Sequence, residues 1–150
     1  MSDTTATEPR VPVTYWIVAI ASILWNAFGA YDYLMTRMRN FDYLKMAGDP
    51  RTLLAWIDSF PLWAQILWPV GVWFSVIGSL LLLIRSRFAP AAFLVSLIGA
   101  LGSFGYQFGA SNIPAALDTT ANKVIPLVIV ALIVFFWWYA KRAVARGWLS

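Results

Sequence analysis

Four long stretches of the chain are mostly hydrophobic and contain no charged side chain. They cover residues 11–31, 59–84, 88–117 and 124–140. An α-helix needs about 17–25 mainly apolar residues to cross a bilayer, and each stretch meets this requirement. The pattern therefore predicts an all-α membrane protein built as a four-transmembrane-helix up-down bundle. We place the spans at about 13–35, 61–84, 88–108 and 124–140.

The polar segments between the spans predict short interfacial helices. In the first long loop, Asp49 can cap a helix that starts at Pro50, and the apolar residues after it gather mostly on one side. In the loop between the third and fourth spans, residues 111–114 can cap a second such helix. Residues 1–12 form a polar tail that we expect to be disordered. A C-terminal tail, 147–150, follows a helix that ends near Gly147.

The composition supports one integral membrane domain, residues 13–146. Hydrophobic residues make up 61% of the chain and charged residues 12%, whereas soluble domains have about 45–50% and about 25%. Cys and His are both absent, which excludes disulfides and any zinc or haem site built from these residues. We expect no cofactor and no bound metal.

The positive charge points to lipid rather than to nucleic acid. The formal net charge is +4, and the basic residues flank the spans, where they meet anionic headgroups. The tightest clusters lie in the turn 85–87 and just after the fourth span. The positive-inside rule then favours cytoplasmic positions for both termini. Because the two sides carry nearly equal totals of Lys and Arg, a dual topology stays open.

Alternating spans bring scattered polar residues to one side of the membrane. The candidate substrate-binding residues there are Asn26, Asp32, Gln65, Tyr106 and Gln107. Asp32 is the one ionisable group close to membrane depth, and it could act as a proton acceptor or as a cation contact. The alternative is an interfacial carboxylate paired with Arg37 or Arg39. We expect the polar residues to line a pocket that opens toward the outside.

Asn26 lies about midway along the first span. An amide at this depth either hydrogen-bonds another helix or contacts a substrate. Asn26 shares one helical face with Gly29, Ala30 and Tyr33, and this small, polar face should point into the bundle. We interpret Trp25 as a packing residue rather than as a platform for a ligand.

Small residues recur at helical spacing on the second and third spans. The predicted helix-packing residues are Gly71, Ser75, Ser79, Ser96, Gly99 and Ser103. Such stripes let helices approach closely in lipid. Pro69 lies inside the second span and has no N–H, so it should leave the carbonyl of Gln65 without its helical donor and kink the helix.

Several short segments carry a resemblance to a known family. They are 25–36 (WNAFGAYDYLMT), Arg39-Asn40 with Tyr43, Ser59-Phe60-Pro61 before Trp63, and Tyr106-Gln107-Phe108. Together they resemble a bacterial family of small four-helix membrane proteins whose members are often labelled sugar transporters. The plan is also loosely similar to DoxX-like proteins. The resemblance extends from about Tyr15 to Arg146 and implies the bacterial inner membrane. It supplies no catalytic residues.

Two functions fit the sequence. The first is a non-enzymatic protein that binds or transports a small solute through a pocket in the bundle. The second is an accessory or structural subunit that packs its aromatic surface and small-residue stripes against a larger membrane complex. A homodimer is compatible with the first. We expect no enzymatic activity, since the sequence has no recognisable nucleophile–base pair, phosphate-binding loop or metal cluster.

Overall fold

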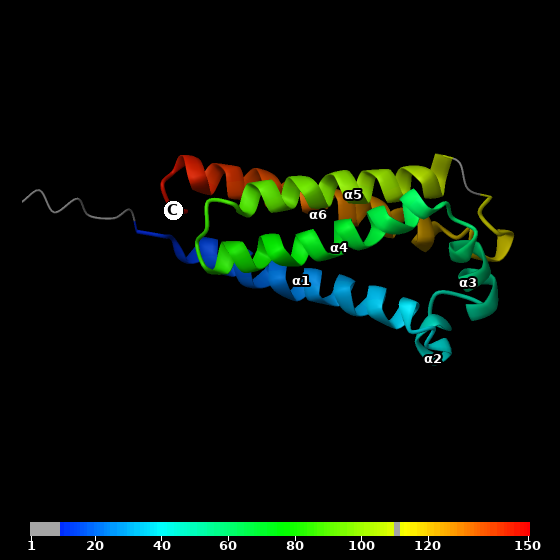
Figure 1. The fold of residues 1–150 in the computed structure, drawn as a ribbon. Coiled ribbons are helices and arrows are strands. Elements are labelled where there is room, and N and C mark those ends of the chain that lie inside the picture. Colours follow the sequence, from blue (N-terminus) through cyan, green and yellow to red (C-terminus); the bar gives the residue numbers. More distant parts are fainter. Residues whose placement is uncertain (1–9, 110–111) are drawn as a thin grey trace, which may run out of the picture.

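The structure is a computed structural model that describes residues 10–109 and 112–150 (Figure 1). Its elements are α1 (Val13–Arg37), α2 (Phe41–Leu44), α3 (Pro50–Asp58), α4 (Leu62–Leu83), α5 (Ala89–Gly109), the 3₁₀ helix η1 (Ala115–Leu117) and α6 (Thr120–Ala145). No strand occurs in these two ranges. Most of the predicted N-terminal tail, residues 1–9, and Ser111 of the predicted cap lie outside the described residues.

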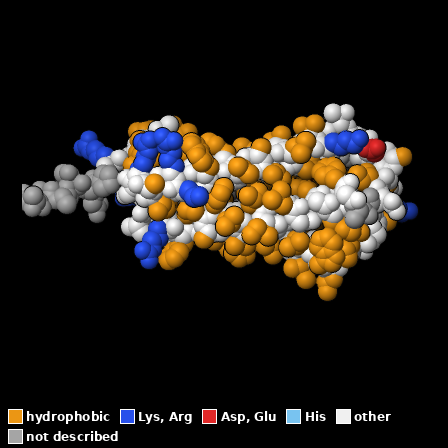
Figure 2. Space-filling model, turned by 90° about the horizontal axis from the view of Figure 1, so that it is seen from above, with side chains coloured by type: hydrophobic (Ala, Val, Ile, Leu, Met, Phe, Trp, Pro, Cys, Tyr) orange, Lys and Arg blue, Asp and Glu red, His pale blue; other side chains and the backbone are white. Residues whose placement is uncertain are grey.

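Helices α1, α4, α5 and α6 are each long and apolar enough to cross a membrane. The predicted all-α four-span bundle is confirmed, and the chain is a multi-pass membrane protein. In chain order, α1 packs against α4, α4 against α5 and α5 against α6. Figure 2 shows one face of the bundle, where apolar side chains fill the middle and charged side chains gather toward the two ends. This distribution matches a bilayer with a polar surface on each side.

Side-chain caps set several helix boundaries. The carboxylate of Asp49 accepts a hydrogen bond from Thr52 N, and Pro50 occupies the first position of α3, as predicted. Asn40 caps α2 in the same way; the sequence pattern did not predict this helix. The side chain of Thr119 caps α6, which extends beyond the expected span at both ends. The second loop helix, η1, is a single 3₁₀ turn without a side-chain cap, because Pro114 precedes it.

The C-terminal residues fold back onto the bundle. Gly147 has a φ of 75°, and the next N–H, that of Trp148, donates to the Ala143 carbonyl at 3.0 Å, so α6 ends in a Schellman motif. The chain then pairs with the turn between α4 and α5. Ser150 N donates to the Arg85 carbonyl at 3.0 Å, and Leu149 is buried. The expected tail is therefore a packed strap across the end of the bundle.

The hydrophobic core lies at this same end, which we call the closed end. Its buried members come from all four spans and include Tyr15, Leu82, Phe93 and Phe136. The Tyr15 hydroxyl donates to the Leu82 carbonyl, and its ring lies 6.2 Å from that of Tyr139, which joins α1 to α6. Toward the opposite end, near α2 and α3, α1 diverges from α4 (Figure 1). Divergence at that end is confined to α1 in this view, since α4 and α5 stay side by side (Figure 1).

Candidate functional site

The bundle contains a pocket of about 310 Å³. All four spanning helices line it. The lining residues are Trp25, Asn26, Phe28, Gly29 and Asp32 from α1; Trp68, Gly71, Val72 and Ser75 from α4; Ala100, Ser103 and Phe104 from α5; and Ile125, Ile129 and Ile133 from α6. Most of these side chains are apolar, so the expected polar pocket is in fact an apolar pocket with a few polar groups.

Each helix contributes one face to this pocket. On α1 the lining residues Trp25, Phe28, Gly29 and Asp32 follow the spacing i, i+3, i+4, i+7. The α4 residues have the same spacing, and the three isoleucines of α6 are four residues apart. A single stripe on each span therefore builds the wall. Gly29 leaves room in it, because a Cβ added there would meet no atom within 4 Å.

Asn26 joins α1 to α4 and also borders the pocket. Its Nδ2 donates to Ser79 Oγ at 2.7 Å and to the Ser75 carbonyl at 3.2 Å. Both hydrogens of the Asn26 amide thus bind α4, so this side chain links the two helices. Oδ1 can only accept a hydrogen bond, and no donor to it is found in residues 10–109 and 112–150. One acceptor of this amide stays available at the pocket wall.

Asp32 lies half-buried at the end of the pocket nearest α2. Its Oδ1 accepts a hydrogen bond of 2.7 Å from the Tyr43 hydroxyl. Burial, followed by this hydrogen bond and by the charge of Asp32, raises the pKa of the Tyr43 phenol above its usual range, so Tyr43 stays a neutral donor. Within the described part of the chain, no basic side chain forms an ion pair with Asp32.

Arg37, one of the two expected partners of Asp32, binds elsewhere. It donates to the Gln65 carbonyl at 3.3 Å, and its guanidinium carbon lies 5.5 Å and 5.4 Å from the ring centroids of Tyr33 and Trp68. Gln65 is four residues before Pro69, so its carbonyl is the one that the proline leaves without a helical donor. Arg37 compensates for that loss, and α4 continues through Pro69.

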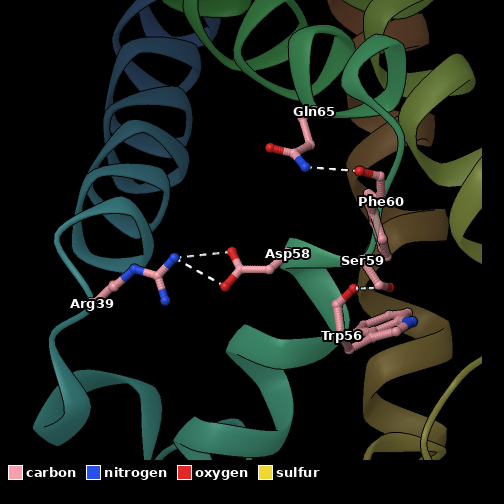
Figure 3. Close-up of polar contacts among 6 residues, drawn as sticks. All are labelled: Arg39, Trp56, Asp58, Ser59, Phe60 and Gln65. Atoms are coloured by element: carbon pink, nitrogen blue, oxygen red, sulfur yellow. Dashed lines mark hydrogen bonds and ion pairs between the residues drawn. The ribbon is translucent and has the colours of Figure 1, made fainter.

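Arg39, the other expected partner, also points away from Asp32. It has a φ of 55° just after α1, and its guanidinium binds both carboxylate oxygens of Asp58 at 3.0 Å (Figure 3). This contact fastens the end of α3 to the end of α1. The alternative in which Asp32 pairs with Arg37 or Arg39 is therefore not found, because each arginine has another partner.

The other three candidate residues lie outside the pocket. Gln65 Nε2 donates to the Phe60 carbonyl at 2.8 Å, next to its own helix start (Figure 3). The Tyr106 ring packs against those of Phe60 and Trp63 at 5.0 Å and 5.4 Å. Gln107 lines a separate cavity of about 10 Å³. These residues share a membrane side with Asp32 but not its side of the bundle.

The small residues expected to pack helices are buried in the bundle. They are Gly71, Ser75, Ser79, Ser96, Gly99 and Ser103. A Cβ added at Gly99 would lie 2.6 Å from Gly71 N, so α4 and α5 are in backbone contact here. Ser96 Oγ also donates to the Gly71 carbonyl at 2.6 Å. The chain's own helices cover these stripes, so a partner protein would have to use other surfaces.

We place the mouth of the pocket between α1 and α6, because its exposed lining side chains lie on these two helices and the two helices are not among the closely packed pairs. Side chains on the two lips are exposed: Phe28 is 61% exposed on α1 and Ile125 is 53% exposed on α6. Both residues lie inside the spanning helices, so the mouth faces the side of the bundle that lipid surrounds. An apolar molecule can reach the pocket from the membrane without crossing the closed end.

Two of the candidate residues, Asn26 and Asp32, line this pocket, but the sequence analysis did not predict its aromatic side chains. Trp25 was interpreted as a packing residue, and Phe28, Trp68 and Phe104 were not among the candidate site residues. The spacing of Trp25, Phe28 and Asp32 on α1 could have indicated the aromatic lining, because residues three and four positions apart lie on one helix face. The face chosen instead, which contains Asn26 and Ala30, is the one that packs toward α4.

Among the described residues, no group of three or more acidic, Cys or His side chains could hold a metal ion. A scan of protein-family models, a search of curated proteins and a search of solved structures each gave no match for this chain.

Proposed function

We propose that this membrane protein binds a small, mostly apolar solute in the pocket between its four spans. The observation that carries the proposal is the cavity of about 310 Å³ with an apolar and aromatic lining. Small-molecule sites typically measure about 300–1,000 Å³ and combine such a lining with a few placed polar groups. Asp32 and Asn26 are the polar groups that would orient the solute.

Binding is better supported than transport. The closed end is filled by a tightly packed core and is crossed by the C-terminal strap. A carrier would have to open this end, and the same contacts would have to break. The sugar-transporter label of the resembling family implies a polyhydroxylated solute, whereas this lining offers few polar partners. We therefore propose a mostly apolar solute rather than a sugar.

The location in the cell is part of the proposal. The resemblance implies the bacterial inner membrane. The turn 85–87 and the end of α6 lie together at the closed end, where the strap joins them. With basic residues from both segments at this end, the positive-inside rule favours a cytoplasmic closed end with both termini inside. The pocket would then lie in the outer half of the bilayer.

Equilibrium dialysis of the purified chain in detergent can test binding. The probe is 1-naphthylmethanol, a neutral aromatic solute, with protein-free micelles as the background. Gly29→Phe should abolish saturable binding, because Gly29 lines the pocket and its side-chain space is open. Gly105→Phe is the matched control, since Gly105 has equally open space but does not line the pocket.

Saturable binding that Gly29→Phe removes and Gly105→Phe retains would support the proposal. Two results would count against solute binding: uptake no greater than that of empty micelles, or equal binding by Gly29→Phe and Gly105→Phe. The proposal is refuted if the amine probe described below gives the same result. The accessory-subunit hypothesis would then lead. It predicts that affinity capture in mild detergent recovers a defined set of membrane proteins.

A further inference from the structure

We infer that the solute is an amphiphilic amine, with a protonated amine bound at Asp32 and an apolar body held by the aromatic and isoleucine side chains. This inference rests on the proposed function and adds the chemical class of the solute. Three features of the pocket support it: the kind of polar atoms it offers, the rings beside them, and the position of its mouth.

Asp32 and Asn26 offer hydrogen-bond acceptors at the wall, beside the hydroxyls of Ser75 and Ser103. Asp32 keeps one carboxylate oxygen beyond the one that Tyr43 occupies, and Asn26 keeps Oδ1, since its donors are used on α4. The two residues are six positions apart, or about 9 Å along the helix axis. A solute that supplies donors is complementary to these two acceptors.

Charge selects an ammonium over a hydroxyl among these donors. The pocket lining contains the carboxylate of Asp32 and no Lys or Arg. A half-buried carboxylate without an ion-pair partner gains more from a cationic donor than from a neutral one, because the ammonium adds a Coulombic attraction to the hydrogen bond that either donor can make. The Tyr43 hydroxyl holds the carboxylate in place but leaves its charge uncompensated.

The rings of the wall favour the same ligand. Trp25, Phe28, Trp68 and Phe104 all line the pocket, and aromatic faces attract organic cations, Trp most strongly. Trp68 already shows this behaviour, since the Arg37 guanidinium lies 5.4 Å from its ring. Arg37 itself is exposed and held by the Gln65 carbonyl, so water and salt screen its charge more than that of Asp32.

The mouth between α1 and α6 suits an amphiphile. Its lips, Phe28 and Ile125, are exposed within the spanning segments, and Asp32 lies near the loop end of α1. An amphiphilic amine in a bilayer keeps its ammonium near the headgroups and its body among the acyl chains. It can therefore move sideways into the pocket with its charged group already level with Asp32.

The test compares two probes that share one ring system. Equilibrium dialysis measures binding of 1-naphthylmethylamine, which is protonated at neutral pH, and of 1-naphthylmethanol to the full chain in detergent. The amine should bind about 10- to 100-fold more tightly than the alcohol, because only the ammonium adds a Coulombic attraction to Asp32. Asp32→Asn should remove this preference, because Asn keeps the shape and loses the charge.

Asp42→Asn is the control for net charge. Asp42 is an exposed carboxylate on α2, and it does not line the pocket. This variant should keep the preference for the amine. Equal affinity for the two probes, or a preference that survives Asp32→Asn, would overturn the inference while leaving the solute-binding proposal intact. Failure of both probes to bind would remove both.

The amine could come from a lipid headgroup or from a free solute. Competition separates these sources. If phosphatidylethanolamine displaces the bound 1-naphthylmethylamine and phosphatidylglycerol does not, the natural ligand is an amine lipid. If neither displaces it, the ligand is a free amphiphilic amine. Displacement by phosphatidylglycerol at least as strong as by phosphatidylethanolamine would count against amine recognition and overturn the inference.

Discussion

Replacing Gly99 by alanine should destabilise the protein, although alanine is normally the better helix residue. A Cβ at this position would lie 2.6 Å from Gly71 N and 2.8 Å from the Leu67 carbonyl oxygen. Heavy atoms in contact prefer about 3.5–4.0 Å, so α4 and α5 would have to move apart by roughly 1 Å. Neither atom can yield alone, because both belong to the backbone of α4.

The magnitude follows from two opposing effects. Overpacking of this kind typically costs about 1–3 kcal/mol, whereas a glycine-to-alanine change inside a helix gains about 0.5–1 kcal/mol. The net loss at Gly99 should therefore be between about 0 and about 2.5 kcal/mol. Gly105 lies on the same helix with no atom within 4 Å of its added Cβ, so Gly105→Ala should show the gain alone.

The assay is reversible unfolding in mixed micelles of a mild detergent and increasing dodecyl sulfate, followed by far-ultraviolet circular dichroism. The free energies of unfolding of Gly99→Ala and Gly105→Ala should differ by about 1–3 kcal/mol, the cost of overpacking by itself. If Gly99→Ala proved as stable as Gly105→Ala, the close approach of α4 and α5 at this level would be refuted.

Three further predictions concern other contacts. Arg37→Met should lower the free energy of unfolding by about 1 kcal/mol, and by less in a Pro69→Ala background, where the new N–H supplies the missing helical donor; a double-mutant cycle measures the difference. Tyr43→Phe should lessen the loss of stability at alkaline pH: the native phenol has a raised pKa, so its contribution is complete below about pH 10 and is lost as the pH rises toward the native pKa. Leu149→Ala should cost about 2 kcal/mol, because this side chain is buried in the strap.

Each of these predictions has a specific contrary result. An equal effect of Arg37→Met with and without Pro69 would show that the arginine does not compensate for the proline. Identical pH dependence in Tyr43→Phe and the wild-type protein, measured by the same unfolding assay, would contradict the raised phenol pKa. Leu62, which is 73% exposed, is the control for Leu149, and equal losses from the two alanine variants would refute the packed strap.

The sequence alone determined the number of spans, their order and the caps that begin the loop helix α3. These features depend on neighbours within a few residues: an apolar run of sufficient length, or Asp49 directly before Pro50. It also identified the glycine and serine stripes, because small residues at a spacing of four mark a close helix contact wherever they occur in lipid. Asn26 and Asp32 were identified because polar groups at membrane depth are costly unless they have a role.

Only the tertiary structure decided which polar residues meet. Gln65, Tyr106 and Gln107 share a membrane side with Asp32, but the rotation of each helix about its axis turns them elsewhere, and span patterning does not determine that rotation when most faces are apolar. The partners of Asp32 and Arg37 depend on contacts between separate segments of the chain. Arg37, for example, binds the Gln65 carbonyl, which Pro69 leaves without its helical donor. The pocket is lined by residues from all four spanning helices, so it is a property of the packed bundle rather than of any single helix.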